Sequence, residues 1–372
     1  MKISSIINAL ETWAPPALQE GYDNSGLLVG HPEQTAQKAL ISLDLTEAVL
    51  EEAITTGCNL IISHHPVIFK GFKRLNGKSE QERIIIKAIK NDIAIYAIHT
   101  NLDNVYTGVN AKIAEKLGIA TPQILAPKAE ILEKLVTFCP LGENEQQETY
   151  TDLVRKAIFE AGAGKIGDYD CCSFHQEGKG SFRPGENTNA FVGKKGEIHF
   201  EKEARIEVIY PAYLRQAILA NLKKAHPYEE VAYDVYPLKN QHPQVGSGMY
   251  GMLEKPIPWK NFLQQVKDNF QLSIIRHTPS VKDHVERIAF CGGSGIFLLP
   301  QAKAIKADVF LTGDVKYHDF FEHQNQLMIA DIGHFESEQF TIDLIFERLS
   351  KIFSNFAFLK TSINTNSINY FL

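Results

Sequence analysis

Short apolar runs alternate with amphipathic segments over residues 38–110. The apolar runs predict buried strands, and the i, i+3, i+4 spacing between them predicts helices. The expected strands are 39–43, 59–63 and 93–98, and the expected helices are 47–56, capped by Thr46 and ended by Gly57, and 79–91. Strands that alternate with helices are typical of βαβ units in a mainly parallel sheet.

The same rhythm returns over residues 286–352. Strands are expected at 287–290, 308–311 and 327–330, and helices from Gly295 to about 306, at about 315–324 and at about 334–352. We expect the two stretches to form one α/β core made of two halves.

The pattern between these stretches is different and predicts an inserted domain. Strands are expected at 135–138, 204–210 and 231–236, helices at 149–161 and 211–224, and a loose stretch at 176–197. This β-α-β…β-α-β order is typical of a small ferredoxin-like α+β module. The expected domains are therefore 1–130 and 241–372, the two halves of the core, and 131–240, the insert.

Composition narrows the class of protein. Hydrophobic residues make up 44% and charged residues 22% of the 372 positions, as in a globular protein, and no apolar run approaches the length of a membrane span. The N-terminal apolar positions are those of an amphipathic helix, not of a signal peptide. A net charge of −6 gives no electrostatic reason to expect nucleic-acid binding. The five cysteines are odd in number and form no C-x-x-C pair, which favours a reducing, cytoplasmic location.

Five polar residues stand where predicted strands end or where the last helix begins. His64 and His65 follow one strand, and Asp103 comes shortly after the next. His334 and Glu338 are four apart and share one face of the last helix. Since ligands of open α/β sheets bind at the carboxyl ends of the strands, we expect all five groups along one edge of one sheet.

Five nitrogen and oxygen ligands exceed what one structural zinc ion uses. They suit two divalent cations with Glu338 as a bridging carboxylate. Two ions roughly 3.5–4 Å apart lower the pKa of a water between them and make hydroxide available at neutral pH. The ligand set fits Zn, Fe, Mn, Co or Ni and does not choose among them.

Each residue also has a structural interpretation. Neighbouring histidines in a strand point to opposite faces, so either His64 or His65 could be a buried, hydrogen-bonded side chain. Asp103 could be a turn residue, and the helix dipole favours a glutamate in a first turn without any metal. The joint placement of the five favours the metal site.

Other candidates are less specific. His318 could be a base that faces the substrate or a surface residue, and His99 could assist the site. Asp314 could cap a helix. The Gly292–Gly295 turn could hold an anion or allow tight packing. The motif at 226–230 could bind a ligand or pack a helix end.

Together these motifs resemble the GTP cyclohydrolase 1 type 2 homolog family, also called the Nif-three-like family. The resemblance covers essentially the whole chain and rests on Asp23-Asn24-Ser25-Gly26, Ser63-His64-His65-Pro66, Thr100-Asn101-Leu102-Asp103, Gly313-Asp314 with Tyr317-His318, and Gly333-His334-Phe335-Glu336-Ser337-Glu338. In the insert, Cys172-Ser173-Phe174 and His226-Pro227-Tyr228-Glu229-Glu230 look like the extra domain of the long bacterial members.

The resemblance implies a cytoplasmic, toroidal homohexamer with a dinuclear metal site that faces an internal cavity, and a PII/CutA-like insert. It implies that His65 and Asp103 bind one metal, that His64 and His334 bind the other, and that Glu338 bridges them. The family name suggests opening of the guanine imidazole ring of GTP.

We therefore expect a metal-dependent hydrolase that acts on a small, nucleotide-like substrate, with His318 or His99 assisting proton transfer. The alternative is a non-catalytic regulator or scaffold, in which the insert senses a small molecule or a partner.

Overall fold

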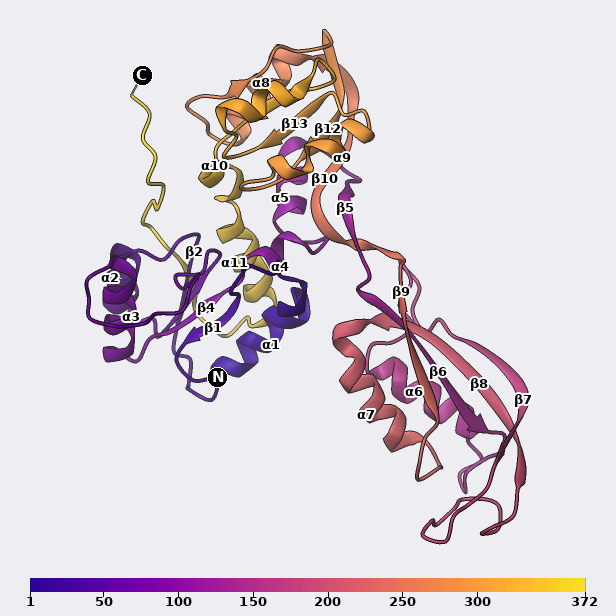
Figure 1. The fold of residues 1–372 in the computed structure, drawn as a ribbon. Coiled ribbons are helices and arrows are strands. Elements are labelled where there is room, and N and C mark those ends of the chain that lie inside the picture. Colours follow the sequence, from indigo (N-terminus) through magenta and orange to yellow (C-terminus); the bar gives the residue numbers. More distant parts are fainter. Residues whose placement is uncertain (372) are drawn as a thin grey trace. The chain divides into compact units, whose positions relative to one another are not determined.

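The computed structural model describes residues 1–371 and divides the chain into two compact units (Figure 1). The first unit, the core, joins residues 1–127 to those from Gln244 onward, and the second, the insert, is Lys128–Pro243. Each unit has its own sheets, and the chain leaves the core after Pro127 and returns to it at Gln244.

The first sheet of the core has the strand order β1-β4-β3-β2-β15, with β1 antiparallel and the other four parallel. Its strands are β1 (Gly26–Val29), β2 (Ala39–Ser42), β3 (Leu60–Ser63), β4 (Ala94–Ala97) and β15 (Phe358–Lys360). Helices α2 (Glu47–Thr56) and α3 (Glu80–Lys90) cover one face, and α1 (Ile3–Trp13) and α11 (Thr341–Ile352) lie on the other (Figure 1). Because both faces are covered, β2, β3 and β4 are buried along their whole length.

The second sheet of the core has the order β11-β14-β13-β12-β10-β5, and β12, β13 and β14 are parallel. Its strands are β5 (Gln123–Ala129), β10 (Gln241–Pro258), β11 (Arg276–His277), β12 (His284–Phe290), β13 (Val309–Thr312) and β14 (Met328–Asp331). The two stretches thus form one unit, as expected, but two sheets. In each sheet, other strands occupy both edges of the central parallel strands: β1 and β15 in the first sheet, and β10 and β11 in the second. The central strands of the two sheets therefore cannot pair with each other.

The remaining helices of the core are short or connect the sheets. They are η1 (Pro16–Leu18), α4 (Thr100–Asp103), α5 (Val109–Leu117), α8 (Trp259–Asn269), η3 (Ile296–Leu298), α9 (Leu299–Ala304), η4 (Tyr317–His323) and α10 (His334–Glu338). The single helix expected over 334–352 is two helices, α10 and α11. The helix is interrupted at Gln339 and Phe340. The Gln339 side-chain amide donates to the Phe270 carbonyl, and the Phe340 ring lies 5.8 Å, between centroids, from that of Phe270.

The insert has the ferredoxin-like fold that the sequence predicts. Its elements are β6 (Leu132–Pro140), α6 (Tyr150–Glu160), β7 (Phe174–Phe182), β8 (His199–Pro211), η2 (Ala212–Leu214), α7 (Arg215–Ala225) and β9 (Tyr233–Leu238). The sheet order β7-β8-β6-β9 with antiparallel neighbours is that of a split βαβ fold. The first part of the stretch expected to be loose, 176–182, belongs to strand β7, and the rest is the connection to β8. Strand β7 is an edge strand, exposed along most of its length, so it shows no apolar alternation.

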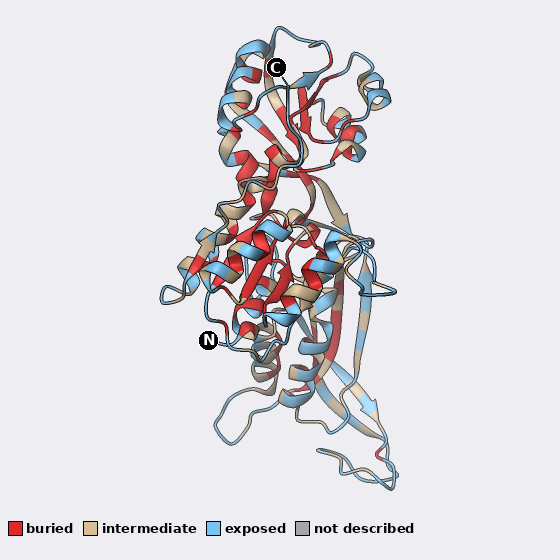
Figure 2. Cartoon of the chain, turned by 90° about the vertical axis from the view of Figure 1, so that its left-hand side faces the viewer, coloured by how far each residue is buried: buried red, intermediate tan, exposed pale blue. Residues whose placement is uncertain are grey.

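Buried residues concentrate in the strands of each unit and the helix faces against them (Figure 2). Within residues 1–371, none of the helices combines the length and apolar character needed to cross a membrane.

Candidate metal centre

His64 and His65 directly follow β3, at the carboxyl edge of the first sheet. The strand ends at Ser63, so the two rings do not alternate between faces but both contribute to one cluster. His64 is fully buried and donates Nδ1–H to the Ile98 carbonyl at 2.7 Å, and His65 donates Nδ1–H to Asp44 at 2.7 Å. Both residues therefore present Nε2 to the cluster.

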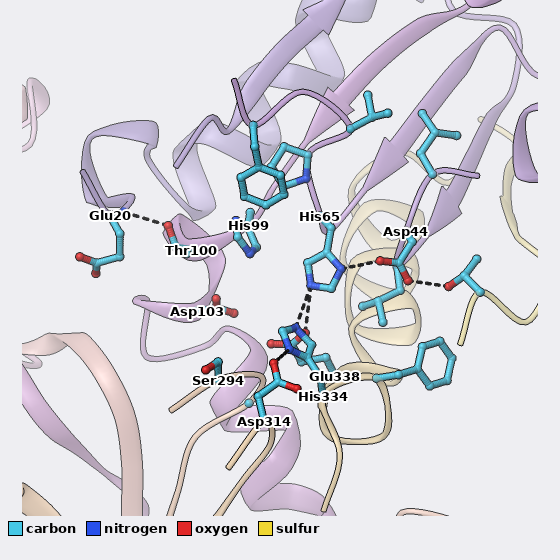
Figure 3. A pocket seen from close by; sticks show the side chains of 18 of the residues that line it. Glu20, Asp44, His65, His99, Thr100, Asp103, Ser294, Asp314, His334 and Glu338 are labelled. Atoms are coloured by element: carbon cyan, nitrogen blue, oxygen red, sulfur yellow. Dashed lines mark hydrogen bonds and ion pairs between the residues drawn. The ribbon is translucent and has the colours of Figure 1, made fainter. Parts of the chain in front are cut away.

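The second sheet positions His334 and Glu338, because both lie on α10, which follows β14. His334 Nε2 and His65 Nε2 both lie 3.1 Å from Glu338 Oε2, and the two nitrogens are 3.4 Å apart (Figure 3). Asp103, at the end of α4, places Oδ1 3.6 Å from His64 Nε2. The expectation of one edge of one sheet is therefore wrong: the five residues come from two sheets whose carboxyl edges meet.

Glycines make this approach possible. Gly293 has φ +60°, and a Cβ at this position would collide with the Glu338 carboxylate and lie 3.2 Å from His334 Nε2. The backbone N–H groups of Gly293 and Gly295 donate to the Ser337 and Thr312 hydroxyls. Close packing, not anion binding, therefore explains the Gly292–Gly295 turn.

Two buried polar atoms of the cluster test whether its residues fit a cation. His64 Nε2 and Asp103 Oδ1 are buried and have no hydrogen-bond partner within the described part of the chain. Buried polar atoms are almost always satisfied, so this pair is the kind that a cation would complete. The imidazole and carboxylate donors suit Zn, Fe, Mn, Co or Ni, and the residues fit a divalent metal site.

The ligand atoms form overlapping groups, each with its atoms within 4.8 Å of one another: His65, His334 and Glu338; His64, Asp103 and Glu338; His64, His65 and His99. Glu338 is common to two groups, as a bridging ligand would be. The pairing differs from that implied by the resemblance, because proximity joins His65 to His334 and His64 to Asp103.

Burial and charge set the proton affinities within the cluster. Burial opposes charge on Glu338, but hydrogen bonds with His334 and His65 hold its pKa well below the ordinary value. Burial and the charge of Glu338 raise the pKa of Asp103 well above its ordinary value. Burial lowers the pKa of His64 to about 3, so this imidazole is neutral and its Nε2 lone pair is available.

Carboxylates behind the cluster fix the orientation of three imidazoles. Asp44 contacts Nδ1 of His65, and Asp314 and Asp23 contact Nδ1 of His334 and His99, each at 2.7 Å. A carboxylate on the distal nitrogen is the usual support of a metal-binding histidine. Asp314 thus has a role beyond the helix cap considered from the sequence.

The segment after β15 reaches one of these carboxylates, Asp44, and a further one on α10. Thr365 donates its hydroxyl to Asp44 Oδ2 at 2.7 Å, and the Asn366 side chain donates to Glu336 at 3.0 Å. Sequence reasoning missed both Asp44 and Thr365. Asp44 lies just past β2, so the strand-end rule that selected His64 could have found it, whereas nothing in the sequence around Thr365 signals its contact.

The two proposed catalytic histidines lie in different places. The His99 ring is 5.3 Å, between centroids, from those of His64 and His65. His318 is exposed in η4, where its ring contacts Tyr317 and Phe321, and it is not among the residues that line the cavity over the cluster.

A cavity of about 810 Å³ opens over the cluster (Figure 3). His65, His99, Asp103, His334 and Glu338 line it. Exposed aromatic rings line it as well: Tyr22, Phe69 and Phe297 are 71%, 50% and 61% exposed.

Comparison with known proteins gives one consistent family. The profile of the Duf34/NIF3 (NGG1p interacting factor 3) family matches residues 1–367. A Halalkalibacterium halodurans protein named GTP cyclohydrolase 1 type 2 homolog is 40% identical over 339 residues, 90% of this chain and 89% of that protein. A Bacillus subtilis protein of the same name is 36% identical over 334 residues, 89% of this chain and 87% of that protein.

Solved structures agree over the full length. The crystal structure of a Bacillus cereus protein related to NIF3 superimposes with a TM-score of 0.85 at 36% identity, covering 100% of this chain and 99% of the other. A Staphylococcus aureus protein gives a TM-score of 0.76 at 29% identity with the same coverage.

Proposed function

This chain belongs to the Duf34/NIF3 family, and from that premise we propose that it binds two divalent cations and hydrolyses a small, nucleotide-like substrate. The observation that carries the proposal is the cluster itself, in which two groups of ligand atoms share Glu338 at the base of a cavity.

The distances within the cluster support a separate set of ligands for each proposed cation. His65 and His334 would hold one, His64 and Asp103 the other, and Glu338 both. Such cations, when bound, polarise a substrate oxygen and make water a stronger nucleophile. Asp44 and Asp314 keep the Nε2 atoms of His65 and His334 turned toward the cluster.

His99 is the better placed of the two histidines for proton transfer. Its Nδ1 is held by Asp23, whose other oxygen accepts from the Thr100 backbone N–H at 3.0 Å, so the ring is fixed with Nε2 as the exchanging nitrogen. It also lines the cavity, whereas His318 does not. We therefore assign His99 the proton-transfer role.

The size and lining of the cavity support a nucleotide-like substrate. Its volume of about 810 Å³ lies in the range of small-molecule sites. Tyr22, Phe69 and Phe297 offer exposed rings on which a planar base can stack, and base–aromatic stacking contributes ~1–3 kcal/mol per base.

The test compares wild type with Glu338→Gln, supplied with Mn, Fe or Zn, on a panel of nucleotides. Because Glu338 is common to both ligand groups, we expect the variant to bind less metal by elemental analysis and to lose more than about 100-fold in kcat/KM.

Glu347→Gln is the matched control, because Glu347 is an exposed residue of α11 that forms an ion pair with Lys112 and does not line the cavity over the cluster. It should retain both metal content and activity. Equal turnover by wild type and Glu338→Gln on every nucleotide would refute the hydrolase proposal, and equal metal content would refute the metal site.

A further inference from the structure

The insert contains a cavity of its own, of about 470 Å³. Cross-strand partners share a face of a sheet, as do residues two apart, so the register of β6, β7 and β8 puts Phe138, Phe182 and Glu203 on one face. These side chains form the floor of the cavity. Its walls are the β7–β8 connection, 183–198, and the α7–β9 connection, 226–232.

Aromatic rings surround this cavity. The Tyr228 ring lies 6.0 Å, between centroids, from both Phe182 and Phe191, and all three line the space. Phe191 is 46% exposed although it stands beside other apolar rings. The rings are therefore arranged around a space that they do not fill.

Carboxylates are the second component of the lining. Glu203, Glu229 and Glu230 line the cavity, against a single cationic side chain, Arg183, which is exposed. The Glu229 carboxylate accepts from the Asn189 backbone N–H at 2.9 Å and so joins the two walls.

Specific contacts hold the Glu203 carboxylate in place at the cavity. The Tyr228 hydroxyl donates to its Oε1 at 3.1 Å, and a Cβ at residue 180 would collide with its carboxylate, so Gly180 makes room for it. Burial, together with the charge of Glu201, raises the pKa of Glu203. The carboxylate is thus partly desolvated, and within residues 1–371 it forms no ion pair with a lysine or arginine.

We propose that this cavity binds a small organic cation, a quaternary or substituted ammonium group, between the rings of Phe182, Phe191 and Tyr228 and beside the carboxylate of Glu203. Aromatic faces attract such cations through the ring quadrupole, and a desolvated carboxylate adds direct charge complementarity. The site belongs to the insert and is independent of the function proposed for the metal cluster.

The test uses the full chain and two probes of nearly the same shape, choline and its neutral isostere 3,3-dimethylbutan-1-ol. Binding is followed by saturation-transfer NMR and by titration at millimolar concentration. We expect choline to bind about tenfold more tightly than the isostere, because only the cation gains from the rings and the carboxylate. Equal affinity for the two probes, or no choline binding, would overturn the proposal.

Variants locate the site. Phe191→Ala and Glu203→Gln should each weaken choline binding about tenfold, since the first removes a partly exposed ring and the second removes charge while keeping an acceptor for Tyr228. Phe200→Ala is the matched control, because Phe200 is 58% exposed on β8 and does not line the cavity. Choline binding that persists in both cavity variants, or falls equally in the control, contradicts this location.

Discussion

At the scale of single residues, the cluster depends on which nitrogen each histidine turns inward. His64, His65, His99 and His334 all bond through Nδ1 to an oxygen, from a backbone carbonyl in one case and from an aspartate in the other three. This shared contact turns the other ring nitrogen, Nε2, of each histidine toward the cluster. A change in a supporting oxygen should therefore alter the metal site without removing a ligand.

Asp44→Asn tests this support. The neutral amide lacks the negative charge with which Asp44 supports the His65 imidazole at Nδ1. We therefore expect metal affinity to fall about 10–100-fold, measured by titration calorimetry on metal-free protein. Thr365→Val should produce a smaller loss, because it removes only the hydroxyl that holds Asp44.

The same tail offers the matched control. Thr361→Val removes a hydroxyl that bonds to Glu52, a residue that does not line the cavity. Unchanged affinity is expected for Thr361→Val. If Asp44→Asn binds metal as tightly as wild type, the carboxylate does not tune the site.

The candidate residues were predictable where a strand end carries a ligand. His64 and His65 stand out because β3 is a continuous apolar run that ends just before them. Asp103 and His334 follow by the same rule. Thr365 could not be predicted, because it reaches Asp44 across 321 positions of sequence through a segment without regular structure.

At the scale of elements, His226 joins the end of α7 to the sheet of the insert. Its Nε2–H donates to the Phe138 carbonyl at 2.9 Å, and its Nδ1 accepts from the Tyr228 backbone N–H at 3.1 Å. A protonated ring could not accept this second bond. Burial lowers the pKa of His226, so the folded insert resists a proton that the unfolded chain binds with a pKa of about 6.5.

The insert should therefore lose stability as the pH falls below about 6.5 toward the lower pKa of the folded state, and retain this contribution above pH 6.5. His226→Gln should abolish this component and cost ~1–2 kcal/mol at pH 7.5 through the lost hydrogen bonds. Hydrogen-exchange protection of the slowest β6 amides, corrected for intrinsic exchange, measures both effects. His175→Gln, at an exposed position of β7, is the control, and an identical pH response in wild type and His226→Gln would contradict the assignment.

Elements were predictable where one of their faces is buried. They were not predictable where neither face is buried or where long-range pairing defines them. The spacing within α2 predicts both its start at Thr46, whose side chain accepts from the Val49 N–H, and its end at Gly57. Strand β7 was not predicted, because it is polar and lies exposed at the edge of the sheet. The division of the core into two sheets is set by pairings such as β15 with β2, which no local pattern encodes.

At the scale of the whole molecule, the core is assembled from both ends of the chain. Strands β5 and β10 are neighbours in the second sheet, and a Cβ on Gly246 would lie 2.7 Å from the Pro127 Cα. The points where the chain leaves and re-enters the core are thus adjacent. The cluster of histidines and carboxylates and all residues that line its cavity belong to the core.

Replacing residues 128–243 with a short glycine–serine linker should therefore leave a folded core. We expect its metal affinity to stay within about threefold of wild type, because no ligand or supporting carboxylate is removed. Choline binding should disappear with the cavity of the insert. Calorimetric titration of each ligand on the shortened chain measures both.

The shortened chain also separates hydrolysis from regulation. If the shortened chain hydrolyses nucleotides as wild type does, and choline does not change the turnover of wild type, the metal site is catalytic without the insert. If choline alters turnover or metal affinity only in the full chain, the insert regulates the core, and the coupling must appear reciprocally as a change of choline affinity on metal binding. A shortened chain that folds but binds no metal would show that the cluster requires the insert, against the division of the molecule into two self-sufficient units.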